Sequence, residues 1–167
     1  QRLAAKGVNG IWMHSVLNKL VPPDGIFPGA EDASQRIAGL KRLVDRAAKY
    51  GIGIYLYMNE PRAMPRTFFD DSLRQQLMGA PEGEQRALCT SAPGVLPWVE
   101  RSVERVFREV PGLGGVFTIT ASENLTNCAS RGGQQRCERC RNRPYAALIV
   151  AVNHAITAGV KSAAPDA

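Results

Sequence analysis

Apolar residues along the chain fall into two kinds of pattern. Short continuous apolar runs led by glycine are typical of strands buried on both faces, and three such runs predict strands at 7–14, 52–58 and 116–121. Longer segments repeat apolar residues at a spacing of three or four, and they predict helices over 31–50, 95–110 and 144–160. Glycine or proline marks most junctions between them.

The strand–helix order, repeated three times, predicts an α/β protein with right-handed crossovers and a parallel sheet. Two architectures share this order, a (β/α)₈ barrel and an open doubly wound sheet. No glycine-rich phosphate loop follows any of the strands, which disfavours a nucleotide-binding sheet. Polar residues instead gather just past the strands, where barrel enzymes keep their chemistry. The sequence therefore favours three consecutive βα units of a parallel (β/α)₈ (TIM-type) barrel, incomplete in this chain.

Three units cannot close such a barrel, so we expect residues 1–167 to be a partial barrel domain of a longer protein. The rest of the barrel, or further domains, would then be a partner of this chain. Two long connections lie between the predicted elements, one over 61–91 and one, containing cysteines, over 128–143. Connections of that length usually carry function or small inserted elements.

Composition narrows the class of protein further. The chain has 44% hydrophobic and 22% charged residues, which excludes a disordered or fibrous protein. It contains no run of about 18 apolar residues and no basic-then-apolar leader, so we expect neither a membrane span nor a signal segment, and no compartment is indicated. The net charge of +6 comes mostly from arginines spread over predicted helices, which solvated helix faces explain.

Two glutamates stand in matched positions past predicted strands. Glu60 follows the second strand and Glu123 the third, each beside an asparagine. Adjacent parallel strands lie about 4.8 Å apart, so the two carboxyls could come within the roughly 5–10 Å that glycoside hydrolysis uses. One carboxyl would act as acid and the other as base or nucleophile. The alternative is structural: Glu60 pairs with Arg62, and Glu123 caps its loop.

Other polar and aromatic residues near the strand ends suit a sugar ligand. Amides bind sugar hydroxyls, an aromatic ring offers a stacking face, and a histidine at the first strand's end can orient the substrate or sit satisfied in the interior. The candidate substrate contacts are His14, Asn59, Arg62, Asn124, Asn127 and Trp12.

The chain has four cysteines, and three of them lie in the 128–143 loop. Cys137 and Cys140 form a Cys-x₂-Cys pair, the kind that makes half of a zinc knuckle. Cys128 would supply a third ligand and Cys89 the fourth, if folding brings it in. A disulfide from Cys128 to one of the pair and free thiols are the alternatives. Zinc or a disulfide would brace the loop beside Glu123, a structural role, and catalysis would require no cofactor.

Five arginines surround these cysteines, which is how some nucleic-acid modules look. No aromatic residue lies between Cys128 and Arg143 to stack on bases, so a nucleic-acid partner is disfavoured. The arginines are Arg131, Arg136, Arg139, Arg141 and Arg143.

Several motifs together resemble a group of bacterial barrel proteins similar in layout to family-20 hexosaminidases and related glycoside hydrolases. They lie at 54–65, 87–91, 117–128 and 137–140. The resemblance implies a barrel fold and a carbohydrate substrate. Family-20 enzymes use an adjacent Asp-Glu pair, whereas Ser122 precedes Glu123 here, so their substrate-assisted scheme does not carry over.

The sequence thus predicts a glycoside hydrolase with a paired-carboxylate mechanism, with Glu123 as acid/base and Glu60 as the second carboxylate. The alternatives are a non-catalytic carbohydrate-binding barrel and, less favoured, a zinc-knuckle module that binds nucleic acid. We expect the 167-residue chain to be inactive by itself, because open barrel edges expose strands to other chains.

Overall fold

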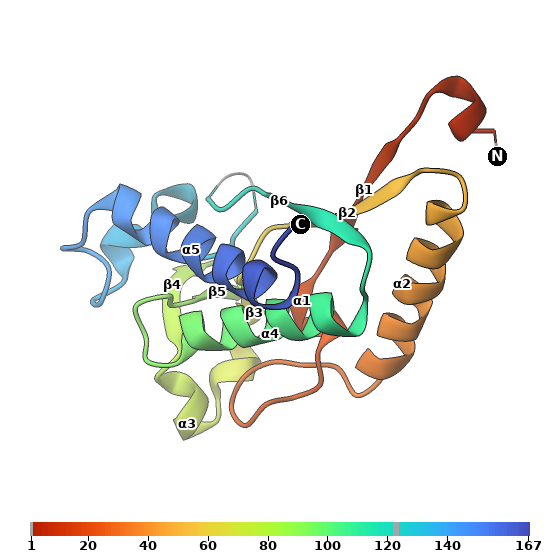
Figure 1. Ribbon diagram of the computed structural model, residues 1–167. Coiled ribbons are helices and arrows are strands. Elements are labelled where there is room, and N and C mark those ends of the chain that lie inside the picture. Colours follow the sequence, from red (N-terminus) through yellow and green to blue (C-terminus); the bar gives the residue numbers. More distant parts are fainter. Residues whose placement is uncertain (1, 122–123) are drawn as a thin grey trace.

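A computed structural model describes residues 2–121 and 124–167 of the chain (Figure 1). It contains a parallel sheet, a separate antiparallel sheet and helices around them. The strands are β1 (Gly10–Ser15), β2 (Gly53–Met58), β3 (Met64–Pro65), β4 (Met78–Glu82), β5 (Gln85–Leu88) and β6 (Leu113–Thr118). The α-helices are α1 (Leu17–Leu20), α2 (Ala33–Ala48), α3 (Ser72–Gln75), α4 (Val95–Glu109) and α5 (Tyr145–Ala163). Short 3₁₀ helices are η1 (Ala4–Lys6), η2 (Arg66–Phe69) and η3 (Ser130–Arg136).

The parallel sheet has the order β1-β2-β6, so each strand lies beside its predecessor in this sheet. The α/β class and the parallel pairing are confirmed. Within the described residues the sheet stays open, with β1 and β6 as edges, so the structure shows no closed barrel.

The two faces of the parallel sheet differ. Ile54, Leu56 and Met58 of β2 point to one face and join a single core with the apolar sides of α2 and α4. The other face is uncovered: Trp12 is 64% exposed, Tyr55 40% and Phe117 55%. The expectation that both faces are buried is therefore wrong for residues 2–121 and 124–167, whose helices cover only one face.

The strand predicted at 116–121 begins earlier, at Leu113. Its register against β2 slips between Ile54 and Tyr55, where Gly114 is the extra residue of a bulge. A Cβ on Gly114 would lie 2.8 Å from the Tyr55 ring, so the strand needs glycine there. The sequence pattern treated these glycines as a break, whereas they belong to the strand.

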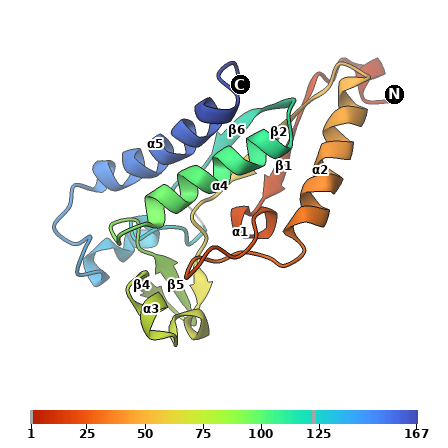
Figure 2. The same cartoon turned by 60° about the horizontal axis from the view of Figure 1, so that its bottom comes forward.

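The 61–91 connection forms the antiparallel sheet, in the order β3-β5-β4, with η2 and α3 beside it. Figure 2 shows β4, β5 and α3 grouped apart from the parallel sheet. Small inserted helices were expected here, but the sheet was not. Both long connections follow strands of the parallel sheet, β2 and β6. They therefore leave from the same side of the sheet, the one where the strands have their carboxyl ends.

Helix α5 packs on α4 through its buried residues. Gly159 permits the contact, because a Cβ there would lie 2.4 Å from the Glu100 carbonyl oxygen. With 19 residues and a mean hydropathy of 1.3, α5 is also long and apolar enough to cross a membrane by length and composition. Such a helix is equally compatible with a protein core, so the expected absence of a membrane span stays a prediction.

Candidate metal centre and strand-end site

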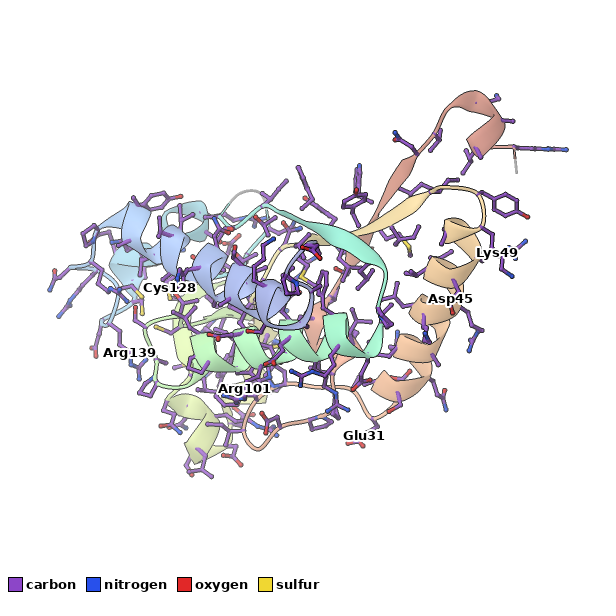
Figure 3. The ribbon with its side chains drawn as sticks, viewed as in Figure 1. Glu31, Asp45, Lys49, Arg101, Cys128 and Arg139 are labelled. Atoms are coloured by element: carbon purple, nitrogen blue, oxygen red, sulfur yellow. The ribbon has the colours of Figure 1, made fainter. Side chains whose placement is uncertain are left out.

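Four cysteines from distant parts of the chain meet at one end of the molecule. Cys89 follows β5, Cys128 follows β6, and Cys137 and Cys140 follow η3. All four are buried, and their Sγ atoms lie within 4.8 Å of one another. Figure 3 labels Cys128 and Arg139 at this end. The predicted gathering of these residues, including Cys89 as the fourth, is confirmed.

The sulfur atoms are not bonded to one another. Cys89 Sγ lies 3.6 Å from both Cys137 Sγ and Cys140 Sγ, whereas a disulfide requires about 2.05 Å. The four cysteines are free. Hydrogen bonds with the Cys128 and Cys89 thiols lower the pKa of Cys137, and the bond with Cys137 raises the pKa of Cys128.

Local structure leaves room for the sulfurs and donates to them. The Ala80 backbone N–H donates to Cys128 Sγ at 3.3 Å. A Cβ on the preceding Gly79 would lie only 2.5 Å from that sulfur. The bend within η3 uses left-handed backbone at Arg131 and Gly132, with φ of 51° and 66°. This turn leads the chain back so that Cys137 and Cys140 reach the cluster.

A buried polar network joins the end of β6 to the cysteine loop. Thr126 Oγ1 and Asn127 Nδ2 both donate to the Thr120 carbonyl, at 2.7 and 2.9 Å. Asn127 Oδ1 accepts from the Ala129 N–H at 2.8 Å, and Ser130 Oγ lies 2.7 Å from Thr126 Oγ1. Asn127 is a predicted sugar contact, but both the nitrogen and the oxygen of its side-chain amide are used to hold the loop. Thr126 belongs to the polar cluster that the sequence shows after the third strand, whereas Thr120 and Ser130 were not predicted to take part.

The predicted strand-end site comprises the residues just past β2 and β6, and Glu123 among them lies outside the described residues. Its loop still meets the loop after β2, since the Ala63 N–H donates to the Leu125 carbonyl at 3.2 Å. The residues just after Glu60 and the described residues from Asn124 onward are therefore adjacent beyond the carboxyl ends of β2 and β6. Asn124, beside Glu123, is partly exposed.

Glu60 is 1% exposed, and both of its carboxyl oxygens are used. Oε1 accepts from the Leu17 N–H at 2.7 Å, and Oε2 from the Arg62 N–H at 3.0 Å. Burial raises the pKa of Glu60 to about 7, against the lowering by the Leu17 N–H, the Arg62 charge and the Arg62 N–H. Glu60 thus links the start of α1 to the end of β2. The predicted contact with Arg62 exists, although it runs through the Arg62 backbone.

The other predicted sugar contacts take different positions. Arg62 Nη2 lies 2.5 Å from His14 Nε2, and the His14 ring packs 5.7 Å from that of Tyr57. Asn59 is fully buried, and neither of its amide atoms has a hydrogen-bond partner among the described residues. Trp12 stands on the uncovered sheet face, 5.1 Å from the Tyr57 ring.

Comparison with models of known protein families and with the sequences of characterised proteins finds no match. The resemblance to barrel glycoside hydrolases therefore remains an expectation from the motifs.

Proposed function

We propose that the four cysteines bind one structural Zn²⁺ ion. The observation that carries the proposal is the set of four buried sulfurs within 4.8 Å of one another. In a tetrahedral site with Zn–S bonds of about 2.3 Å, neighbouring sulfurs lie about 3.8 Å apart, close to the 3.6 Å between Cys89 Sγ and its two neighbours. Four protein ligands leave no open position, so the metal braces the fold and takes no part in a reaction.

Charge also favours the metal. Four thiolates and one Zn²⁺ carry a net charge of −2, which is costly to bury without nearby positive charge. Exposed arginines flank Cys137 and Cys140 in the sequence, and Arg139 Nη1 bonds to the Met78 carbonyl at 3.2 Å. Arg139 and Arg143, which bonds to Ser91 Oγ, therefore supply positive charge beside the metal, and this role weakens the nucleic-acid alternative.

Zinc stoichiometry tests the proposal. We expect the purified chain to hold one zinc per molecule, and a cobalt-loaded sample to show the intense thiolate charge-transfer bands of a tetrahedral sulfur site. Cys140→Ser and Cys89→Ser should each lose the metal, whereas Ser72→Ala, on exposed α3, should keep it. A wild-type chain without stoichiometric metal after refolding in zinc would contradict the site.

We further propose that the chain is part of a barrel that acts on glycans, with its site at the carboxyl edge of the parallel sheet. The support is the strand order β1-β2-β6 with α2 and α4 on one face, as in consecutive barrel units. The Ala63–Leu125 hydrogen bond adds that the loop after Glu60 meets the chain two residues after Glu123. Closing the barrel would cover Trp12, Tyr55 and Phe117.

In this proposal Glu123 is the general acid/base, and Asn59, Arg62, His14, Asn124 and Trp12 contact the sugar. Asn59 suits the role because its buried amide has no partner among the described residues. Glu60 does not suit the role of second catalytic carboxylate, because both of its carboxyl oxygens already accept hydrogen bonds from backbone N–H groups. With no second carboxylate free for catalysis at Glu60, the alternative of a barrel that binds carbohydrate without cleaving it is favoured.

The substitution Glu123→Gln in the complete protein distinguishes a glycoside hydrolase from a barrel that only binds carbohydrate. For a glycoside hydrolase, we expect cleavage of aryl glycosides to fall by at least about 10²-fold while glycan binding remains. A binding barrel should hold glycans on an array, with no turnover by either form. Steeply salt-dependent binding to RNA instead would support the nucleic-acid alternative.

A further inference from the structure

We propose that Ser91 and Arg143 are positioning residues of the metal centre and form a hydrogen-bond relay to the Cys140 thiolate. The inference rests on the zinc site proposed above. It concerns how the chain holds one sulfur in place and slows loss of the metal.

The relay is a short line of polar atoms at the side of the cluster. Arg143 Nη1 lies 2.7 Å from Ser91 Oγ, and Ser91 Oγ lies 3.3 Å from Cys140 Sγ. Ser91 comes two residues after Cys89, and Arg143 three residues after Cys140. The relay therefore joins the two cysteine-bearing segments a second time, beside the metal itself.

Chemistry sets the direction of the relay. A guanidinium has donors only, so Arg143 donates and Ser91 Oγ accepts. In the free thiol form, Cys140 can donate its S–H to the same oxygen. A zinc-bound Cys140 is a thiolate without a proton, so the remaining partner for it is the Ser91 O–H, which then donates to sulfur. The guanidinium polarises that hydroxyl and strengthens the bond.

A buried glutamine fixes the position of Arg143. Gln134 Nε2 donates to the carbonyl oxygens of both Cys140 and Arg143, the first at 3.0 Å. It therefore clamps the turn from Cys140 to Arg143. This clamp fixes the backbone from which the Arg143 side chain reaches Ser91, so less conformational entropy is left to lose when the relay forms.

Hydrogen bonds to metal-bound groups orient the ligands, and their loss typically weakens metal binding by about 10–100-fold. A donor to Cys140 also draws charge from the sulfur, so the thiolate is a poorer target for competing metals and protons. Without the relay, Cys140 becomes the ligand that leaves first.

The experiment compares zinc release from the intact chain to a coloured chelator, and the charge-transfer spectrum of the cobalt form. We expect Ser91→Ala and Arg143→Gln each to speed zinc release by about 10-fold or more and to shift the cobalt–thiolate band. Ser91→Thr, which keeps the hydroxyl, should restore the wild-type rate. Arg141→Gln is the matched control: it removes an exposed arginine from the same loop and should change neither readout.

The outcomes distinguish the two proposals. If wild-type chain binds no zinc or cobalt, the metal site fails and the relay with it. If wild-type binds zinc and Ser91→Ala releases it at the wild-type rate with an unshifted cobalt band, only the relay is wrong. If Arg141→Gln accelerates release as much as Arg143→Gln, general loss of positive charge explains the effect, and the relay is overturned. Far-ultraviolet circular dichroism of each metal-loaded variant shows that the fold is retained.

Discussion

The cysteine end of the molecule and the uncovered face of the parallel sheet differ in one respect. This chain supplies the groups that pack the first region, whereas it leaves the second region open to solvent. At the cysteine end, four clustered cysteine sulfurs, a backbone N–H that donates to one of them and a buried polar network all come from this chain. On the sheet face, three large aromatic side chains lie open to solvent, although parallel sheets are normally covered on both sides. The chain thus supplies every protein group of the first region, whereas it leaves the aromatic face of the second open to solvent within the described residues.

Metal removal should give the largest difference between the two regions. Structural zinc contributes about 10–16 kcal/mol to the folding of zinc-finger peptides, so chelation should open β4, β5 and η3 while β1 and β2 keep their core contacts. Amide hydrogen exchange with and without chelator measures this directly. Equal acceleration in β2 and β5 would show that the two regions unfold as one unit.

The two tryptophans offer a matched pair for the next effect. Trp98 is 1% exposed and stacks on Phe27, with ring centroids 5.8 Å apart. Trp98→Ala should lower the free energy of unfolding by about 3–5 kcal/mol. Trp12→Ala on the open face should change it by less than about 0.5 kcal/mol. Urea unfolding of the zinc-loaded chain measures both, and a large loss in Trp12→Ala would mean that the face is already covered, for instance by a second copy.

Glu60 predicts a pH effect at the strand-end site. Its pKa rises from 4.5 to about 7 on folding, so the folded state binds the proton more tightly. This stabilisation is fully present below pH 4.5 and is lost as pH rises through about 7, a fall of about 3 kcal/mol. The free energy of unfolding should drop between pH 5 and 8 in wild type and stay flatter in Glu60→Gln. Glu31→Gln, at an exposed site, should keep the wild-type slope.

Gly79→Ala should destabilise the cysteine end by less than Trp98→Ala destabilises the core. Its Cβ would lie 2.5 Å from Cys128 Sγ and 2.9 Å from the Ala87 carbonyl oxygen. We expect a loss of about 1–3 kcal/mol in the zinc-loaded chain. Gly39→Ala in α2 has no atom closer than 3.8 Å, and it should stabilise by up to about 1 kcal/mol. Thermal unfolding measures both, and equal effects would show that the cluster is loosely packed.

Much of the fold follows from local patterns. β2, α2, α4 and α5 lie within a few residues of where apolar spacing and glycines put them, because these signals are local. The antiparallel sheet was missed since β4 contains Gly79 and Pro81, two residues that disfavour strands. The start of β6 was missed because the bulge at Gly114 depends on the Tyr55 ring, which no local pattern shows.

The candidate sites divide in the same way. The Cys-x₂-Cys pair gave two ligands, and counting cysteines suggested the other two, so the metal centre could be predicted almost whole. The roles of Glu60 and Asn127 could not, because they depend on which backbone N–H and carbonyl groups the fold brings to them. Ser91 lies two residues after Cys89, and this nearness to a cysteine was the available sequence signal for its role.

The placement of the tryptophans also makes the chain its own optical reporter. The sequence has two of them, one in the core and one on the open face, so their fluorescence should differ in colour and in access to quenchers. In a Trp98→Phe chain, all indole emission would come from Trp12. A blue shift on adding a candidate partner or sugar would then report directly that the aromatic face has been covered.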